Sequence, residues 1–537
     1  MKRTRTSLWA LLILAGLGRW VPPADATTHP FGSHTQAYAS GSIRPNQYTQ
    51  SQLDADTRSF YDAWKAKYLI SGCGTGRYYI DVSGGSGGGR SAQSITVSEG
   101  HGYGMVIAAL MAGYDPQAQA IFDGLYWFFK DHPSINDPYL MAWNQVQGCG
   151  DANGPDSATD GDLDIAYSLL LADQQWGSSG SINYLQEGRN VISAIKAKEL
   201  HPSARTVLLG DWASQDTGIY LNGTRPSDFM LDHFRAFQAA TGDPVWTQVI
   251  AACQRVVSSI QTNYSPATGL VPDFVENAPT TPMPAVPNYL EASTDGDVAY
   301  NSCRVPWRLG TDFLVSGDAS TRAEVQKINT WVIGNTHGDP TLIRSGYHLD
   351  GTAYVTYYDM PFVVPFAVGA MVDASNQAWL NSLWGVVRAQ PLASEDYFGN
   401  TLKMLGMIVL SGNWWTPSDV AAPPPPIPPI PPLPPVPPSP PSSNPTADFS
   451  NVRVFPNPWR SDRNASRPMT FDGLTPGATV NIFTVSGHHV KTVTAGTGSA
   501  VWDLTNESGS RVASGYYLYL ATDAAGHLGR GKFAIIR

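Results

Sequence analysis

Residues 157–176 read SATDGDLDIAYSLLLADQQW, a stretch with the pattern of a helix that starts among carboxylates. Asp160, Asp162 and Asp164 occupy alternate positions directly before an apolar run that holds helical spacing. Because a short acidic side chain is a good N-cap and suits the positive end of a helix dipole, we expect Asp160 or Asp162 to cap a helix over 161–176. The neighbouring carboxylates then surround the helix start, where they can bind a hydroxyl group or position a water molecule.

The same three- and four-residue spacing of apolar side chains recurs through the N-terminal part and predicts about twelve helices. The predicted helices cover residues 57–70, 101–113, 116–130, 161–176, 182–198, 226–241, 244–262, 300–316, 319–335, 361–373, 376–389 and 396–411. Long Gly- and Pro-rich loops lie at 71–98, 135–160 and 263–299. Loops of this length in a compact domain are usually functional or flexible.

The two ends of the chain differ from this helical part. Residues 1–26 combine a basic start, an apolar run and a final Ala-x-Ala sequence, which is typical of a secretory signal peptide. Residues 421–446 are mostly proline, a composition that extends as a polyproline II spacer and forms neither helix nor sheet. We therefore expect an all-α domain over 27–420, a linker over 421–446 and a separate domain over 447–537.

The C-terminal domain has the pattern of short strands. Runs such as 479–483 and 516–520 alternate with Gly, Asn and Asp turns, which predicts a β-sandwich. The domain resembles the immunoglobulin-like C-terminal domains of flagellar-hook capping proteins and type IX secretion cargo, through VFPNPW at 454–459, the Ser486-Gly487 turn and GYY at 515–517. The resemblance implies a sorting and anchoring signal or a spacer, and the sequence does not separate these roles.

Composition and cysteine usage limit the partners. A net charge of −10 with 15% charged residues leaves no basic stripe for phosphates, which argues against nucleic acid. No segment after residue 26 is long and apolar enough to span a bilayer. Cys73 and Cys149 lie in Gly-rich loops and are expected to form a disulfide. Cys253 and Cys303 lie in helical patterns and are expected to be buried thiols, although an exported protein also allows them to pair.

Residues 158–176 as a whole resemble the signature of glycoside hydrolase family 8. That signature runs Ala, Ser or Thr, Asp, Ala or Gly, Asp, then Ile-Ala, a small residue, aliphatics, Ala and an aromatic. The matching residues here are Ala158, Thr159, Asp160, Gly161, Asp162, Ile165, Ala166, Ser168, Ala172 and Trp176. The resemblance covers most of 50–415 and implies an (α/α)6 barrel that acts on a β-linked polysaccharide and needs no cofactor.

The resemblance also assigns an acid. Glycosidic hydrolysis needs a carboxylic acid that protonates the departing oxygen and a carboxylate that activates water or attacks the sugar. Glu99, in the string SEGHGYGM at 98–105, aligns with the segment that carries the family's proton donor. The small residues around Glu99 let a large ligand approach. Asp160 corresponds to the aspartate that binds the sugar at the cleavage point and helps to distort it.

The base departs from the best-known branch of the family, in which Asp follows Tyr in a Tyr-Asp-x-x-Arg string. Here Asn301 follows Tyr300, and a neutral amide cannot serve as a carboxylate base. A second branch, which includes chitosanases and some lichenan- or cellulose-degrading members, has Asn here and takes a Glu from a long preceding loop. The loop 263–299 holds two glutamates. We favour Glu291, close before Asn301, over the alternative, Glu276. The family implies inversion, with water between the two carboxyls.

Aromatic and polar side chains are expected to line the substrate cleft. The substrate-binding candidates are Trp143, Trp212, Tyr300, Asn301, Arg304 and Tyr397. Of these, Trp143 resembles a family position that stacks on sugar, and Arg304 is expected beside Asp160 or the attacking water. The loop aspartates do not reproduce a calcium-binding loop with its central Gly and closing Glu, so no metal site is expected.

The sequence therefore predicts a secreted, monomeric endo-β-1,4-glucanase that hydrolyses cellulose or mixed-linkage β-glucan. A chitosanase or licheninase of the same family is the first alternative, because a cleft rich in carboxylates would suit a polymer that carries amines. The alternative of another class is a glycan-binding surface protein on a degenerate hydrolase scaffold. That interpretation is supported by Asn301 and by the C-terminal domain, which suggests contact with a cell surface or a secretion machinery.

Overall fold

The computed structural model describes residues 27–85, 93–417 and 449–536, apart from 153, 217, 450–451, 462–466, 486–487, 497, 508 and 526. The predicted signal peptide, the proline-rich linker and the Ser486-Gly487 turn lie outside the described residues. The chain divides into two compact units, Met1–Pro428 and Pro429–Arg537. The largest hydrophobic core belongs to the first unit, and the second unit has a core of its own.

The first unit is helical. The twelve α-helices among its described residues are α1 (Gln50–Tyr68), α2 (Ser98–Leu110), α3 (Ala118–Asp131), α4 (Thr159–Trp176), α5 (Tyr184–Lys198), α6 (Leu231–Thr241), α7 (Val245–Asn263), α8 (Val305–Ser316), α9 (Ala319–Asn335), α10 (Met360–Ala370), α11 (Gln377–Ala389) and α12 (Tyr397–Leu410). Each corresponds to a segment predicted from apolar spacing. α6 and α8 begin later than predicted, because short 3₁₀ turns, η2 (Pro226–Asp228) and η3 (Ser302–Arg304), precede them.

α1 begins earlier than its apolar pattern suggested, and the reason is a cap. The Thr49 side chain accepts a hydrogen bond from the Gln52 backbone, and the Gln52 side chain accepts one from the Thr49 backbone. This reciprocal capping box satisfies two backbone N–H groups at the helix start. The helix therefore gains a polar first turn ahead of its buried face.

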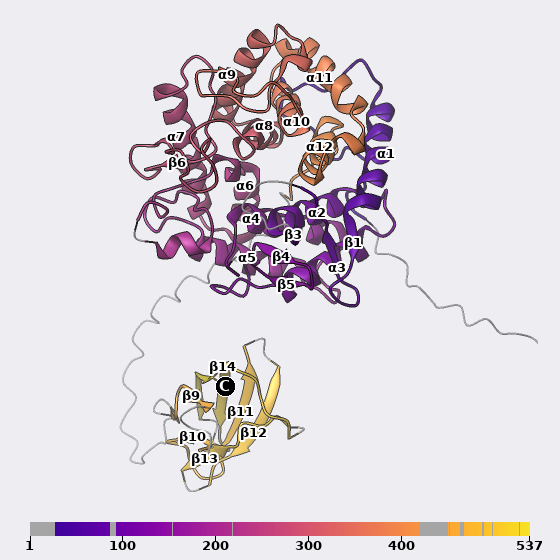
Figure 1. Ribbon diagram of the computed structural model, residues 1–537. Helices are drawn as coiled ribbons and strands as arrows, with labels where there is room; N and C mark the ends of the chain where they lie inside the picture. Colours follow the sequence, from indigo (N-terminus) through magenta and orange to yellow (C-terminus); the bar gives the residue numbers. More distant parts are fainter. Residues whose placement is uncertain are drawn as a thin grey trace, which may run out of the picture. The chain divides into compact units, whose positions relative to one another are not determined.

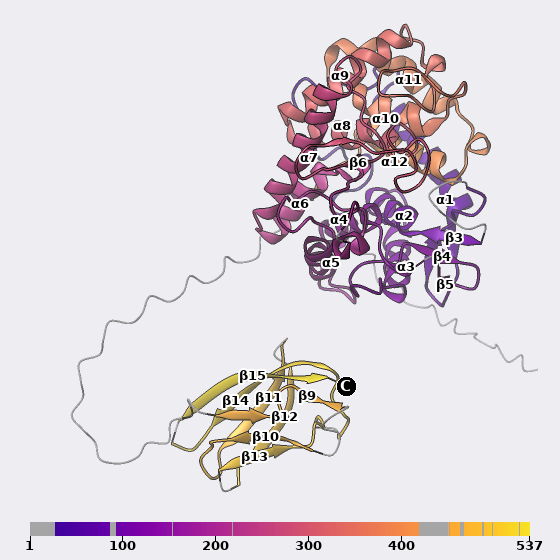
Figure 2. The same cartoon turned by 60° about the vertical axis from the view of Figure 1, so that its left-hand side comes forward.

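Six of the helices contact one another in a closed ring. Each even-numbered helix contacts the next one, in the order α2, α4, α6, α8, α10 and α12, and α12 contacts α2. Each ring helix also packs against an odd-numbered helix outside the ring, as α5 does on α4 and α1 does on α12. Figure 1 shows this arrangement, and Figure 2 shows the same helices after a 60° turn. A ring helix has neighbours on nearly all sides, so apolar residues surround it rather than forming one stripe.

Burial follows that arrangement. All residues of α10 are buried, and in α2 only Glu99 is not. The outer helix α1 instead buries one face, with Leu53, Tyr61 and Trp64 turned inward. The exception in α2 is therefore informative, because a single carboxylate interrupts an otherwise buried helix.

Short strands occupy the long loops that helical periodicity left unassigned. They are β1 (Leu69–Ser71), β2 (Tyr78–Ile80), β3 (Ser94–Val97), β4 (Asn144–Val146), β5 (Gly150–Asp151), β6 (Val275–Glu276) and β7 (Met283–Pro284). β4 pairs antiparallel with both β3 and β5. β3 runs directly into α2, and the Ser98 backbone N–H donates to the Trp143 carbonyl at 2.9 Å. This small sheet therefore holds the Trp143 segment against the start of α2.

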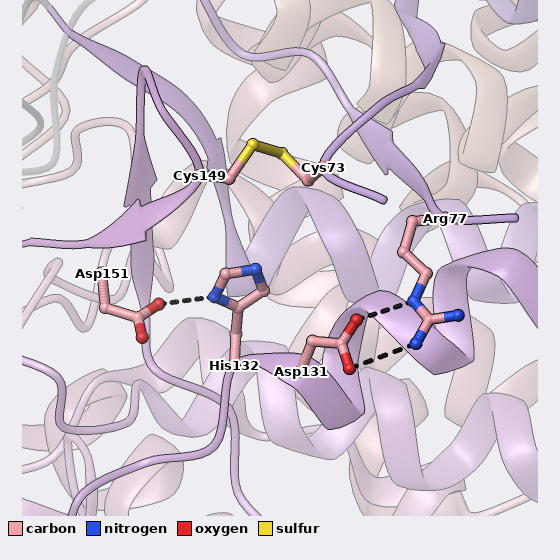
Figure 3. Close-up of a disulfide and its surroundings, with 6 residues drawn as sticks. All are labelled: Cys73, Arg77, Asp131, His132, Cys149 and Asp151. Atoms are coloured by element: carbon pink, nitrogen blue, oxygen red, sulfur yellow. Dashed lines mark hydrogen bonds and ion pairs between the residues drawn. A yellow bond between two sulfur atoms is a disulfide. The ribbon is translucent and has the colours of Figure 1, made fainter. Parts of the chain in front are cut away.

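A disulfide joins two of these loops, as predicted (Figure 3). Cys73 follows β1, Cys149 lies in the turn between β4 and β5, and their Cα atoms are 5.6 Å apart. His132 contacts the Asp151 carboxylate at 2.8 Å in the same region. Cys253 and Cys303 are buried free thiols, which was also the favoured prediction.

The second unit consists of strands. They are β8 (Arg453–Phe455), β9 (Trp459–Arg460), β10 (Met469–Asp472), β11 (Thr479–Thr484), β12 (His489–Thr494), β13 (Ser499–Trp502), β14 (Gly515–Thr522) and β15 (Leu528–Ile536). One sheet has the order β13-β10-β8 and the other β12-β11-β14-β15-β9. Buried side chains from both sheets, among them Phe471, Trp502 and Phe533, form one core. The strands predicted at 479–483 and 516–520 are confirmed as β11 and β14.

None of the described helices has the length and apolar character needed to cross a membrane.

Candidate active site

A cavity of about 550 Å³ lies where the ring helices begin. Its walls include seven of the predicted site residues: Glu99, Trp143, Asp160, Glu291, Tyr300, Asn301 and Tyr397. Glu99, Asp160 and Tyr397 belong to the first turns of α2, α4 and α12, and other lining residues precede α6, α8 and α10. The positive ends of the helix dipoles therefore face this cavity, which favours carboxylates at its wall.

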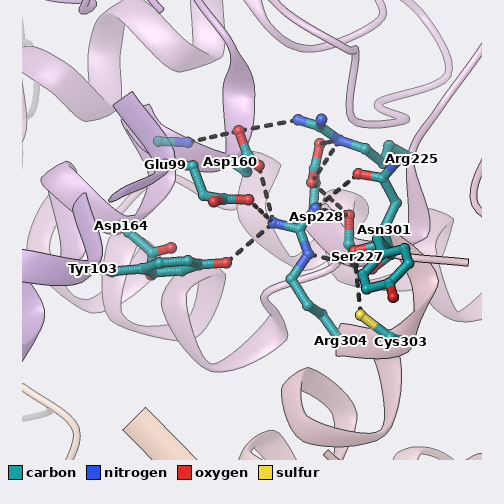
Figure 4. Close-up of polar contacts among 12 residues, drawn as sticks. Glu99, Tyr103, Asp160, Asp164, Arg225, Ser227, Asp228, Asn301, Cys303 and Arg304 are labelled. Atoms are coloured by element: carbon teal, nitrogen blue, oxygen red, sulfur yellow. Dashed lines mark hydrogen bonds and ion pairs between the residues drawn. The ribbon is translucent and has the colours of Figure 1, made fainter. Parts of the chain in front are cut away.

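Glu99 enters the cavity from the start of α2. Arg304 Nη1 donates to Glu99 Oε2 at 2.7 Å, and the Tyr397 hydroxyl donates to Oε1 at 2.9 Å. The side chain retains 19% exposure, whereas the rest of α2 is buried. Glu99 thus combines access to the cavity with two donors that complement a carboxylate, and Figure 4 shows the contact with Arg304.

Glycines bring α2 and α4 into close contact beside this carboxylate. A Cβ atom on Gly161 would lie 2.5 Å from the Ser98 carbonyl carbon, and one on Gly102 would lie 2.9 Å from the Gly161 oxygen. Side chains at these positions would force the two helices apart. Because Ser98 precedes Glu99 and Gly161 follows Asp160, the close contact sets the two carboxylates side by side.

Neither predicted N-cap is found at the start of α4, so that prediction was wrong. The N-cap position is Ala158, which has no capping side chain, and Asp160 and Asp162 lie in the buried first turn. Their carboxylates have tertiary partners instead. Asp160 forms an ion pair with Arg225 at 3.0 Å and accepts a hydrogen bond from Arg304 at 3.1 Å, while Asp162 accepts one from the Met141 backbone at 2.8 Å.

The two arginines control the charge of Asp160. Burial raises the pKa of the Asp160 carboxyl, but the guanidinium groups of Arg225 and Arg304 outweigh burial and hold that pKa below its ordinary value. Asp160 is therefore an ionised carboxylate at neutral pH, which suits hydrogen bonding to a ligand hydroxyl and does not suit proton donation.

Arg304 is buried next to the cavity and donates hydrogen bonds to several of the residues around it. It has 1% exposure and is the last residue of η3, directly before α8. Besides Glu99 and Asp160, it donates to the Tyr103 hydroxyl at 3.0 Å, the Ser227 hydroxyl at 3.0 Å and Asn301 Oδ1 at 2.9 Å. Arg304 thus lies beside Asp160, one of the two positions expected for it from the sequence. A planar guanidinium is suited to this task because it offers five donors in a fixed geometry.

Asn301 links Arg304 to Glu291 through hydrogen bonds. Its Oδ1 accepts from Arg304, and its Nδ2 donates to Glu291 Oε2 at 2.9 Å. Arg225 Nη1 stands 4.0 Å from the other oxygen of Glu291. The loop around Glu291 is fixed by Asp295, whose carboxylate accepts from the backbone of residues 290–292.

The two glutamates of the long loop have different positions. Glu291 lines the cavity and has a side chain with 26% exposure. Glu276 does not line it, belongs to β6, and accepts from the Val286 backbone at 2.8 Å. Only Glu291 of this pair reaches the groups around Glu99.

Trp212 lies outside the cavity wall. It is half-buried against an apolar cluster that includes Leu208 and Phe274, and its ring meets Tyr220 edge-on with centroids 5.2 Å apart. Its assignment to substrate binding therefore remains a prediction without a position in the described cavity.

Several cavity residues were missed by sequence reasoning. Arg225, Asp359 and Glu395 line the wall. The Tyr300 hydroxyl donates to Asp359 at 2.8 Å, and burial raises the pKa of Asp359 above its ordinary value. Burial likewise raises the pKa of Glu395 to about 7. Arg225 stands in an Arg-Pro-Ser-Asp string that carries no periodic signal, so only the fold brings it to Asp160. No group of His, Cys, Asp or Glu that could hold a metal occurs among the described residues.

Glycoside hydrolases use a pair of carboxyl groups in one cavity. The cavity here has such a pair, together with an ionised aspartate between two arginines. The family model described as glycosyl hydrolases family 8 matches residues 51–412, and the chain belongs to this family. It is similar to a β-glucanase of Niallia circulans, with 47% identity over 391 residues that cover 73% of this chain and 92% of the relative. It is also similar to an endoglucanase of Bacillus sp. strain KSM-330, with 40% identity over 71% of this chain and 81% of that relative.

Solved structures agree with this assignment. The apo structure of a β-1,3-1,4-glucanase from Paenibacillus sp. X4 matches with a TM-score of 0.69 and 47% identity, over 73% of this chain and all of that chain (100%). Rex8A from Paenibacillus barcinonensis, solved with xylose, matches with a TM-score of 0.58 and 17% identity, over 70% of this chain and 98% of that chain. The second likeness bears on the fold alone.

Proposed function

We propose that this chain is a secreted endo-β-1,4-glucanase that hydrolyses cellulose or mixed-linkage β-glucan with inversion. Glu99 is the general acid, Glu291 is the general base, and Asp160 binds the sugar at the cleavage point. The observation that carries the proposal is that Glu99 and Glu291, from elements far apart in sequence, line one cavity and connect through Arg304 and Asn301. The relatives named β-glucanase, endoglucanase and β-1,3-1,4-glucanase support the substrate class.

The acid step uses the donors around Glu99. When Glu99 gives its proton to the departing glycosidic oxygen, negative charge develops on its carboxylate. Arg304 and Tyr397 already direct donors at its two oxygens, 2.7 and 2.9 Å away, so they stabilise that charge without rearrangement. Asp160, held ionised by Arg225 and Arg304, binds a hydroxyl of the sugar whose bond is broken.

The base step uses the loop. Glu291 removes a proton from a water molecule, which attacks the anomeric carbon from the side opposite the departing oxygen. The Asn301 amide donates to one Glu291 oxygen and leaves the other for water, with Arg225 nearby at 4.0 Å. Asn301 thus acts as an orienting donor, and the carboxylate base comes from the preceding loop.

The remaining proposals concern architecture and location. The closed ring of α2, α4, α6, α8, α10 and α12, with an outer helix on each, supports an (α/α)6 barrel. The two sheets around one core support an immunoglobulin-like sandwich in the second unit. The signal-like sequence at 1–26 supports export. The exported chain is proposed to be a monomer that attaches to a cell surface or secretion machinery through its second unit. Export suits a substrate too large to enter a cell.

The first test is reducing-sugar release from carboxymethylcellulose, barley β-glucan and chitosan by the wild type and by Glu99→Gln, Glu291→Gln and Glu276→Gln. We expect the first two variants to lose activity by a factor of about a thousand, because each removes a proton-transfer group. Glu276→Gln is the matched control, a loop glutamate outside the cavity wall, and it should retain activity. Activity that survives in Glu291→Gln and disappears in Glu276→Gln would reassign the base.

The stereochemistry has its own test. Proton NMR of the first products released from β-glucan should show the α-anomer before mutarotation, because attack opposite to a β-linked leaving group inverts the anomeric carbon. Early appearance of the β-anomer would require a retaining mechanism and a different role for Glu291.

Two other functions are favoured by particular observations. Asp359, Glu395 and Asp396 add carboxylates to the cavity wall, which favours an amine-bearing polymer and hence a chitosanase. Preferential cleavage of chitosan in the first test would identify it. With lichenan added as a fourth polymer, a preference for lichenan would identify a licheninase. The Asn301 substitution favours a glycan-binding protein. Retained binding of β-glucan without product release from any polymer would establish that function.

A further inference from the structure

Two buried carboxyls face each other behind the cavity wall. Asp162 lies in the first turn of α4, Glu199 is the C-cap residue of α5, and both have 0% exposure. One oxygen of each carboxyl accepts a hydrogen bond. Asp162 Oδ1 accepts from the Met141 backbone at 2.8 Å, and Glu199 Oε1 accepts from the Ser157 hydroxyl at 2.6 Å. The second oxygen of each, Oδ2 and Oε2, has no donor among the described residues. The side chains of Asp162 and Glu199 also interact with each other.

The surroundings supply more negative charge and no compensating cation. Asp211 from η1 (Asp211–Gln215) and Asp228 from η2 both act on Glu199, and Asp211 also acts on Asp162. Asp211 also acts on Asp156 from the preceding loop, while Asp160 and Asp164 belong to the same turn of α4. No Lys, Arg or His of the described chain forms an ion pair with Asp162 or Glu199. The buried arginines of this region, Arg225 and Arg304, pair instead with Asp160, Asp228 and Glu99.

Two acceptors that meet without a donor need a proton between them. An ionised pair would place two like charges in contact in a dry site, which is strongly unfavourable. Burial, with Asp211 and Asp228, raises the pKa of Glu199 to about 8. Burial and the neighbouring Glu199 likewise hold the pKa of Asp162 well above its ordinary value. Both directions agree with a pair of carboxyls that keeps a proton at neutral pH.

The pair connects segments that carry site residues. Asp162 binds the backbone of Met141, which lies two residues before Trp143. Glu199 binds the side chain of Ser157, which lies three residues before Asp160. The Ser157 backbone also donates to Asp211, beside Trp212, at 3.0 Å. Two cavity residues thus depend on one buried junction.

We propose that Asp162 and Glu199 share one proton, and that this proton-sharing pair positions Asp160 and Trp143 for catalysis and sets the alkaline limit of activity. The positioning part rests on the proposed function, because it takes Asp160 and Trp143 to bind substrate. When hydroxide or a buffer base removes the shared proton, the two carboxylates repel each other. The junction opens, and Met141 and Ser157 lose their fixed acceptors.

The decisive variant is Glu199→Gln. Its amide Nε2 donates to Asp162 Oδ2 as the protonated Glu199 does, and its Oε1 still accepts from Ser157, but the amide does not titrate. Above the pH at which the pair loses this proton, each further pH unit lowers the fraction of protonated wild-type molecules about tenfold, so kcat/KM falls by about the same factor. In the same pH range, Glu199→Gln should keep the kcat/KM that it has at neutral pH. The pH at which its kcat/KM falls on the alkaline side should therefore be higher than in the wild type.

The matched control is Glu324→Gln. Glu324 in α9 is also a buried carboxyl, and burial together with Asp318 raises its pKa to about 8, but it does not line the cavity. In both variants a carboxyl is lost whose pKa is raised on folding. For such a group the stabilisation is complete below the unfolded pKa and is lost as pH rises through the folded pKa. Both variants should therefore make the melting temperature less sensitive to pH between about 4 and 8, while only Glu199→Gln moves the limb of kcat/KM.

An infrared difference spectrum tests the proton itself. Wild type minus Glu199→Gln at pH 6 should show the C=O band of a protonated carboxyl, whether or not the chain hydrolyses any polymer. Absence of that band overturns the shared proton. If Glu199→Gln does not fold, wild type minus Asp162→Asn provides the same spectrum. The positioning role is overturned if the alkaline fall of kcat/KM occurs at the same pH in Glu199→Gln as in the wild type. It is also overturned if Glu324→Gln shifts this fall by the same amount as Glu199→Gln. If no polymer is cleaved at all, the proposed function fails while the infrared result still decides the proton.

Discussion

At the scale of single residues, Arg304 connects the groups on which the proposed chemistry depends. One Nη1 atom lies within hydrogen-bond distance of Glu99, Asp160 and Tyr103, and the other side-chain nitrogens bond Asn301 and Ser227. The ammonium of a lysine has three donors on a flexible stem and no planar fork. It cannot point at all of these acceptors at once, so some of them are left without a donor.

We therefore predict that Arg304→Lys lowers kcat on barley β-glucan by about a hundredfold, because sub-ångström positioning of Glu99 and Asp160 is lost. It should also lower the free energy of unfolding by about 3–5 kcal/mol, since it leaves buried carboxylates poorly paired. Initial rates and urea unfolding measure the two effects.

Arg308→Lys is the matched control for this prediction. Arg308 is also a buried arginine with a carboxylate partner, Asp164 at 2.7 Å, but it contacts none of the cavity carboxylates. It should lose stability by a similar amount and retain most of its kcat. If the two variants lose the same share of kcat, the role assigned to Arg304 is wrong and its effect is structural.

Sequence reasoning at this scale succeeded where a string of residues carries the signal. Glu99 and Asp160 stand in long motifs, and the structure places both at the cavity. Asn301 indicated that the base had to come from elsewhere, but only the fold separates Glu291 from Glu276. Arg225, Asp359 and Glu395 could not be found, because single residues gathered from separate loops leave no pattern in the sequence.

At the scale of elements, the contact between α2 and α4 depends on residues that lack a side chain. Gly161 lies where a Cβ atom would stand 2.5 Å from Ser98. We predict that Gly161→Ala lowers the free energy of unfolding by about 1–3 kcal/mol through overpacking. It should also reduce kcat on β-glucan by more than tenfold, because the displaced backbone carries both Glu99 and Asp160; about tenfold is the effect of a 1.4 kcal/mol rise in the barrier. Thermal unfolding and initial rates measure both.

Gly385→Ala provides the comparison, because Gly385 lies inside α11 and has no atom within 4 Å of the position that a methyl group would take. Alanine is the better helix former, so this change should raise the free energy of unfolding by about 0.5–1 kcal/mol and leave kcat unchanged. A destabilised Gly385→Ala would mean that glycine substitutions in these helices act through something other than the space available.

The disulfide gives a second prediction for elements. Cys73 and Cys149 are 76 residues apart in sequence, and Cys149 follows the strand that continues from Trp143. We predict that the double variant Cys73→Ser, Cys149→Ser loses about 2–4 kcal/mol of unfolding free energy, because the unfolded chain gains the freedom of an open loop. The reduced wild type should unfold at the same urea concentration as the double variant. A clear difference between them would show that the serines, and not the missing bond, cause the loss.

Elements differed in how far the sequence could predict them. The twelve helices follow from apolar spacing, since ring and outer helices both bury residues at three- and four-residue intervals. The strands β1 to β7 span only two to four residues each, too few for a period-two pattern to be recognised. The N-cap at α4 was mispredicted because Arg225, Arg304 and Met141 supply partners for Asp160 and Asp162, and local capping rules do not include such distant donors.

At the scale of the whole molecule, the chain contains two units with separate cores. The core of the first unit runs from Leu53 to Trp415, that of the second from Phe449 to Ile535, and they share no residue. Every residue that lines the cavity belongs to the first unit. The composition of 421–446 is enough to predict this division, because a proline-rich run cannot pack into a core.

Separate cores predict separate unfolding, and a truncation can test the prediction. Calorimetry of the mature chain should resolve two transitions, because each unit has a hydrophobic core of its own. A chain that ends after residue 417 should keep the transition of the helical unit and lose the other. Its kcat/KM on soluble barley β-glucan should stay within about twofold of the full chain, since all cavity residues remain. A single transition in the full chain, or a large loss of kcat/KM on truncation, would mean that the second unit supports the active site directly. It would then have to be counted as part of the catalytic machinery, and export or attachment could no longer be its sole role.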